Sequence, residues 1–106
     1  MFGVVLVLSL LFLQSSPQNY DMECLWCINV VYSAQDYFGD DIVNATNQQL
    51  DDYFNQECRL DRIKSPLLSA VCYEMFQNHQ DALFKDLRQN ASALQTCLDC
   101  GFCETS

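Results

Sequence analysis

Apolar residues recur every three or four positions along most of the chain, which is the spacing of one face of an α-helix. The first such segment runs from about residue 22 to residue 38, and one face of it holds Cys24, Cys27, Val31, Ala34 and Phe38. Other apolar residues flank this face, so the predicted helix is apolar almost all round. Gly39 and the acidic pair after it are expected to end the helix.

Local start signals predict the helices that follow. A second helix begins at Thr46, which has a glutamine three residues later in the capping-box pattern. A third opens at Ser65-Pro66, a cap residue before a proline at the first helical position. The helical pattern continues over residues 81–87, as a bend of the third helix or as a separate one, and a last helix begins near Ser92. Since no stretch alternates long enough to predict a strand, the fold class is all-α with four to five helices.

The start of the chain has a different pattern. Residues 4–13 form a ten-residue apolar run broken by Ser9 alone, and the first 16 residues carry no charged side chain. The run is too short to cross a bilayer, which takes about 20 apolar residues. Its length is that of the apolar part of a signal peptide. We therefore expect a signal peptide over residues 1–18, cut between about residues 15 and 20, and one domain over residues 19–106 that is secreted, extracellular or lysosomal.

Seven cysteines in 106 residues then favour disulfides, because the secretory route is oxidising. Each predicted helix places a cysteine, or a pair, on its apolar face. A cysteine there is turned toward another helix, where a disulfide needs Cα atoms about 5–6 Å apart. The same route is consistent with two glycosylation motifs, at Asn44 and Asn90, which both lie between periodic segments.

Charge and motif spacing exclude several function classes. The chain has 14 acidic and 5 basic residues, a net charge of −9, which argues against nucleic acid as a partner. Cys24 and Cys27 with Cys97 and Cys100 could in principle form a four-thiolate zinc site, but 69 residues separate the two pairs and the compartment favours oxidation. A redox pair would need a βαβ pattern that is missing here. The sequence also shows no arrangement of a catalytic triad. Taken together, these observations lead us to expect no metal, no cofactor and no enzymatic activity.

The order of the cysteines is Cys24-x2-Cys27, then Cys58, then Cys72, then Cys97-x5-Cys103. On a small, acidic, helical chain this order resembles the saposin-like family, whose members contain saposin B-type domains. The resemblance covers about residues 23–103. It implies a fold of two helical leaves that close over an apolar interior or open onto lipid.

The resemblance also implies a disulfide pairing. Carried over by position, it joins Cys24 to Cys103, Cys27 to Cys97, and Cys58 to Cys72. The 13-residue gap between Cys58 and Cys72 is longer than the usual family spacing, and Cys100 makes the number of cysteines odd. Cys24 to Cys100 is thus an alternative bridge, and the cysteine left over is either free or a link between two chains.

The apolar excess of the first helix bears on function. Leu25, Trp26, Val30 and Tyr37 lie outside its cysteine-bearing face and are candidates for lipid contact; packing against another helix or a homodimer partner is the alternative. A basic cluster near the second interhelical turn could meet anionic head groups, or could be ordinary surface charge; its members are Arg59, Arg62 and Lys64.

The function implied is a lipid-binding or membrane-interacting protein. We expect engagement to be stronger at acidic pH, where the chain loses part of its negative charge but stays acidic, at about −4 to −5 near pH 4.5. A pore-forming or membrane-lytic antimicrobial effector is the first alternative. A disulfide-rich protein ligand with no lipid role is the second.

Overall fold

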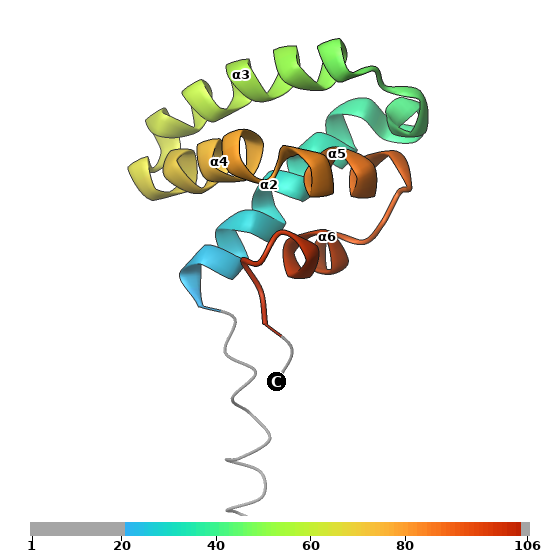
Figure 1. Ribbon diagram of the computed structural model, residues 1–106. Coiled ribbons are helices and arrows are strands. Elements are labelled where there is room, and N and C mark those ends of the chain that lie inside the picture. The colour runs from blue at the N-terminus through green and yellow to red at the C-terminus, as the bar shows by residue number, and fades with distance from the viewer. Residues whose placement is uncertain (1–20, 105–106) are drawn as a thin grey trace, which may run out of the picture.

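The computed structural model describes residues 21–104, which form five α-helices and one 3-10 helix (Figure 1). The elements are α2 (Met22–Phe38), η1 (Gly39–Asn44), α3 (Asn47–Lys64), α4 (Pro66–Asn78), α5 (Gln80–Arg88) and α6 (Ala93–Asp99). No strand occurs within residues 21–104. The predicted all-α fold class is confirmed. The predicted signal peptide and the two residues after it lie outside the described residues.

Side-chain caps begin the helices where the sequence predicts. Thr46 and Gln49 form the complete capping box of α3, with Thr46 Oγ1 accepting from the Gln49 N–H at 3.1 Å. Ser92 caps α6 in the same way. Asp21 Oδ1 accepts from the Cys24 N–H and so caps α2. Each cap satisfies an N–H group that has no partner within its helix.

We expect Ser65→Ala to lower the free energy of unfolding by about 1 kcal/mol, because Ser65 Oγ accepts from the N–H groups of Leu67 and Leu68 at the start of α4. Urea unfolding followed by circular dichroism measures this difference. Ser65→Asp retains a cap acceptor and should keep most of the stability. An equal loss in both variants would contradict the capping role.

Two local features go beyond the sequence prediction. After Gly39, whose φ of +59° ends α2, the chain makes the 3-10 turn η1 and buries Ile42. Such a short turn has too few residues to show a period. The helical pattern after α4 is a separate helix, because His79 leaves the helical region with φ −129° and ψ 29°. The open question about residues 81–87 is therefore settled in favour of a separate α5.

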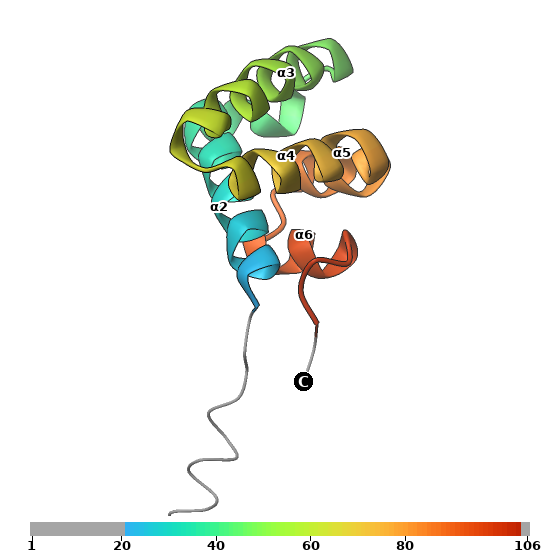
Figure 2. The ribbon, with the colours of Figure 1, turned by 90° about the vertical axis from the view of Figure 1, so that its left-hand side faces the viewer.

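The other helices are stacked in layers, and α2 runs along one side of these layers (Figures 1 and 2). α3 packs against α4, α2 packs against both α4 and α6, and α5 packs against α6. Three aromatic rings, from α3, α4 and α5, stack in the core. Phe54 lies 5.8 Å from Phe76 and 6.1 Å from Phe84, measured between ring centroids.

Three disulfides staple these helices. Cys24 is bonded to Cys103 and Cys27 to Cys97, so both bridges tie α2 to α6 or to the segment after it. Cys58 is bonded to Cys72, which ties α3 to α4. These are the three pairs that the family resemblance implies. Cys100 is the cysteine outside a disulfide among residues 21–104, and it is buried.

Candidate functional site

A groove of about 700 Å³ runs between the start of α2, α4 and the segment after α6. Its apolar lining comes from all three parts of the chain and consists of Met22, Trp26, Leu67, Ala70, Val71 and Phe102. Glu23, Glu74 and His79 also line it and supply polar and ionisable groups. The groove thus combines an apolar wall with a few polar groups, the usual composition of a ligand pocket.

Helix geometry and one disulfide produce this wall. Met22 and Trp26 are four residues apart on α2, and Leu67 and Val71 are four apart on α4, so each pair shares one helix face. Phe102 follows Gly101, whose φ of +83° turns the chain back toward α2. The Cys24–Cys103 bond, with Cα atoms 4.7 Å apart, then holds the Phe102 segment beside the start of α2.

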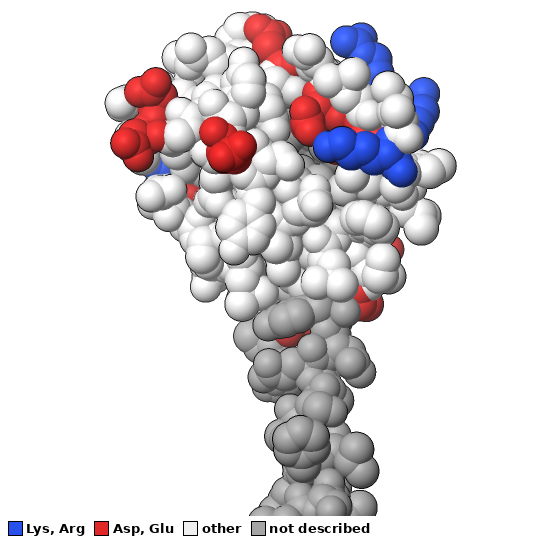
Figure 3. Space-filling model, turned by 180° about the vertical axis from the view of Figure 1, so that it is seen from behind, with Lys and Arg blue, Asp and Glu red and all other residues white. Residues whose placement is uncertain are grey.

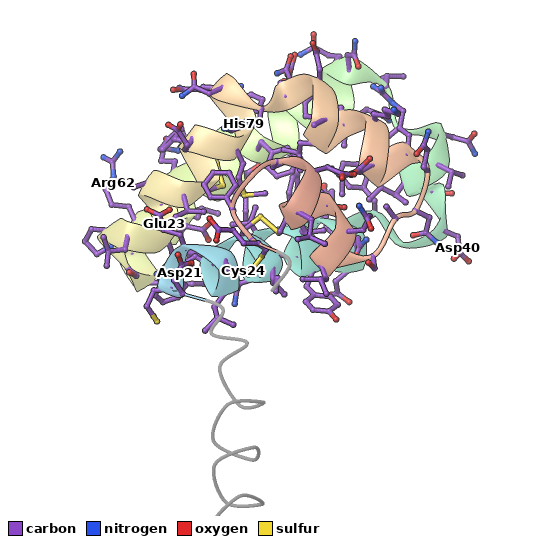
Figure 4. All side chains as sticks on the ribbon, turned by 60° about the horizontal axis from the view of Figure 1, so that its bottom comes forward. Asp21, Glu23, Cys24, Asp40, Arg62 and His79 are labelled. Carbon is purple, nitrogen blue, oxygen red and sulfur yellow. A yellow bond between two sulfur atoms is a disulfide. The ribbon has the colours of Figure 1, made fainter. Side chains whose placement is uncertain are left out.

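Two ring-bearing side chains, Trp26 and His79, line the groove. The Trp26 side chain is half-buried, and its Nε1–H is buried with no hydrogen-bond partner among the described residues. The His79 ring meets Phe102 edge-on, with 5.5 Å between the centroids. His79 lies between α4 and α5 and is half-buried at the groove (Figure 4).

Cys100 lies in the groove wall but is only 2% exposed. Burial raises the pKa of its thiol to about 11, and the carboxylates of Asp86 and Asp99 act in the same direction. The thiolate is the nucleophilic form of cysteine, so this sulfur is unreactive at neutral pH. A disulfide from Cys100 to a second chain would require the segment to open first.

Behind this wall, two carboxyl groups meet between α5 and α6. Asp86 is 5% exposed, and its Oδ2 accepts no hydrogen bond from any donor among residues 21–104. Burial, together with the adjacent Asp99, raises the pKa of Asp86 to about 6. The pKa of Asp99 is lowered instead, because it accepts from Asp86 and from Gln95 Nε2 at 2.8 Å. Below about pH 6, where Asp86 is protonated, its carboxyl can therefore donate to Asp99.

Another buried acid lies at the end of α3. Burial of Asp61 and the nearby Glu57 raise the Asp61 pKa to about 6, against a smaller lowering effect of Lys64. Both raised pKa values fall between pH 5 and pH 7, so each carboxyl takes up most of a proton over that range. The sequence contains no signal for these shifts, because they depend on burial.

A second, smaller groove of about 530 Å³ lies between the end of α2 and α3. Tyr37, Phe38, Tyr53 and Leu60 supply its apolar lining, beside Gln49, Gln56 and carboxylates. Tyr37 and Tyr53 are in ring contact, with centroids 4.8 Å apart. The more polar lining makes this groove the weaker candidate for an apolar ligand.

The structure separates the four candidates for lipid contact. Trp26 lines the main groove, and Tyr37 lines the second one. Leu25 is exposed on α2. Val30 is 1% exposed in the core, out of reach of either groove, because its position on α2 faces the other helices.

Sequence reasoning did not single out the groove residues Leu67, Val71 and Phe102. Leu67 and Phe102 give no signal on their own, since each becomes part of a wall only when distant segments meet. Val71 does follow the apolar period of α4, which predicts burial but not its place beside a groove.

The other predicted residues lie on the surface. Arg59, Arg62 and Lys64 are exposed in the last turns of α3. Both glycosylation candidates are exposed, Asn44 at the end of η1 and Asn90 in the turn after α5.

Comparison of the chain with protein-family models, with curated proteins and with solved structures finds no match. In the described part of the chain, no helix is long and apolar enough to cross a membrane. Over the same residues, no group of three or more His, Cys, Asp or Glu side chains is placed to hold a metal ion.

Proposed function

We propose that this protein is a secreted or lysosomal, saposin-like protein that binds lipid and interacts with membranes. The observation that supports this proposal most directly is the groove between α2, α4 and the segment after α6. The cysteine order and the three bridges support the family resemblance. The same bridges support an oxidising compartment.

An acyl chain fits the physical character of the groove. Its volume of about 700 Å³ falls within the range of roughly 300–1,000 Å³ typical of small-molecule pockets. Each methylene group that leaves water for an apolar wall contributes about 0.8 kcal/mol. The disulfides hold the helices independently of what fills the groove. The fold therefore tolerates an apolar wall that is not covered by the protein itself.

The polar groups of the groove indicate how a lipid lies in it. Glu23 and Glu74 disfavour a negatively charged head group at this position by like-charge repulsion. A zwitterionic or neutral lipid with its tail along Val71 and Phe102 agrees with this repulsion.

Engagement is expected to be stronger at acidic pH. Asp61 and Asp86 take up protons near pH 6, in addition to the general titration of exposed groups. The net charge, which is −9 at pH 7, then becomes less negative, and the repulsion between the chain and anionic bilayers falls.

Filling the groove tests the proposal directly. Ala70 is exposed on α4 and lines the groove, so Ala70→Trp should weaken binding of a fluorescent lysophosphatidylcholine at least ten-fold. Gln77→Trp is the matched control, because it adds the same side chain at an exposed position of the same helix that does not line the groove. Equal binding of the lysolipid by both variants would contradict the assignment of the groove as the lipid site.

Liposome measurements at pH 5 and pH 7 separate the proposal from its alternatives. Co-flotation with anionic liposomes without dye release, stronger at pH 5, supports a lipid-binding protein. Dye release at pH 5 would favour the pore-forming effector instead. If the wild type neither floats with liposomes nor binds the lysolipid, the protein-ligand alternative replaces the proposal.

A further inference from the structure

Positive charge is concentrated at one end of this acidic molecule. Arg59, Arg62 and Lys64 are three of the five basic residues of the chain, and all three lie in the last six positions of α3. Figure 3 shows Lys and Arg side chains gathered at one end of one face of the molecule. Figure 4 shows Arg62 projecting outward at the end opposite Asp40.

Large apolar side chains are exposed among these cations. Ile63, between Arg62 and Lys64, is 84% exposed, the highest value for a large apolar side chain among the described residues. Leu67, in the first turn of α4, is 64% exposed, and Leu60 is also exposed. Singly exposed apolar residues need no explanation, but three of them around one turn, with cations between them, form an amphipathic surface.

The turn that carries these side chains is rigid. One residue, Ser65, separates α3 from α4, and its side chain caps α4. The Cys58–Cys72 bond joins the two helices with Cα atoms 5.2 Å apart. The Ser69 hydroxyl donates to the Cys58 carbonyl at 2.8 Å. The exposed apolar side chains therefore project from a fixed turn and not from a flexible loop.

The nearby acids are placed differently from the cations. Asp61 is 3% exposed, so its carboxyl is turned away from the outer surface. Glu57, which contributes to the raised Asp61 pKa, is half-buried one turn earlier. The basic groups, by contrast, are all exposed.

We propose that the turn between α3 and α4 is a docking tip for an anionic lipid bilayer; its members are Arg59, Leu60, Arg62, Ile63, Lys64 and Leu67. In the docked state Ile63 and Leu67 enter the acyl boundary, and the cations meet lipid phosphates and carboxylates. Because Leu67 also lines the groove, docking brings the groove to the bilayer surface. This inference rests on the proposed lipid-binding function.

Charge complementarity favours a bilayer over a second copy of the chain. With a net charge of −9, two copies repel each other, and the tip is where this acidic chain concentrates exposed cations. The carboxylates of Glu23 and Glu74 disfavour anionic head groups inside the groove. Anionic lipid would thus be bound at the tip, and the ligand lipid in the groove.

The test is flotation at pH 5 with vesicles of phosphatidylcholine containing 30% phosphatidylserine. We expect Ile63→Asn and Arg62→Glu each to lower the bound fraction at least five-fold. Tyr32→Asn, exposed on α2, and Lys85→Glu, exposed on α5, are the matched controls and should stay within two-fold of the wild type. Lys85→Glu changes the net charge by the same amount as Arg62→Glu. All four positions are exposed, and thermal unfolding verifies that each variant folds.

Lysolipid binding by the same variants separates the tip from the groove. Tip variants that keep lysolipid binding but lose vesicle binding support the tip. Vesicle binding at the wild-type level by both tip variants would overturn it while leaving the groove proposal intact. The tip is also overturned if Lys85→Glu loses as much as Arg62→Glu, or if pure phosphatidylcholine vesicles bind equally well. A wild type that binds neither lysolipid nor vesicles overturns the proposed function itself.

Discussion

Replacing all four cysteines of the two terminal bridges by alanine is expected to unfold the protein, whereas removing either bridge alone leaves it folded. Cys24–Cys103 and Cys27–Cys97 are nested and span 79 and 70 residues. While one bridge remains, the other closes a loop of only roughly ten residues and contributes roughly 3 kcal/mol in the chain-entropy model. When both are lost, the long loop opens as well, and the total loss is roughly 7 kcal/mol.

That loss matches the whole stability of many small domains, which is about 5–15 kcal/mol. The consequence is specific to α6, because this seven-residue helix is too short to persist without its attachment to α2. Urea unfolding of the two double variants and the quadruple variant measures the effect. Removal of Cys58–Cys72 is the comparison and should cost roughly 3 kcal/mol for its 15-residue loop. A quadruple variant with an unfolding midpoint near that of the double variants would refute the coupling.

Stability is expected to rise by about 2 kcal/mol between pH 7 and pH 5, owing to Asp61 and Asp86 together. Each has a folded-state pKa of about 6 against an ordinary value of 3.8. The folded protein therefore binds more protons than the unfolded chain between these values. The stabilisation is complete below about pH 4 and is lost as the pH rises through about 6. Part of the full shift is screened by solvent, which the figure of about 2 kcal/mol allows for.

Burial and the charged groups around each carboxyl account for the direction of the pKa shifts. Asp86 faces Asp99 of α6 and the Cys100 thiol, with Lys85 as the neighbouring cation. Asp61 faces Glu57 and Tyr53, with Lys64 opposing them. In both places, burial is the largest cause and like charge adds to it.

Asparagine variants separate the two contributions. Asp86→Asn and Asp61→Asn should each raise the free energy of unfolding by about 1 kcal/mol at pH 7 and flatten its dependence on pH. Asp36→Asn, an exposed position on α2, removes the same charge and should leave the pH dependence unchanged. Thermal unfolding at pH 5, 6 and 7 measures all four proteins. If the wild type is most stable at pH 7, the pH dependence has the opposite sign, and the raised pKa values of Asp61 and Asp86 are contradicted.

Local chemistry accounts for the parts of the fold that the sequence predicted. The caps at Thr46, Ser65 and Ser92 act within one helical turn, so their pattern is visible in consecutive residues. The apolar period likewise identifies which face of each helix is buried, as Phe54 and Met75 show. The 3-10 turn η1 was missed because six residues are too few for a period.

The candidate site was predicted less completely. Trp26 was identified from its place outside the cysteine-bearing face, and it does line the groove. Val30 was identified by the same reasoning and lies in the core, because an apolar position does not reveal whether another helix covers it. Phe102 was missed, since only the Cys24–Cys103 bond brings it beside α2.

The sequence by itself determined where the capped helices begin, the net negative charge and the order of the cysteines, because each of these depends on composition or on contacts within a few residues. The tertiary structure alone decided which apolar residues line a groove, which acids titrate near pH 6 and which apolar residues stand among the cations of α3. These properties depend on burial, and burial arises only when segments as distant as α2 and Phe102 are packed together.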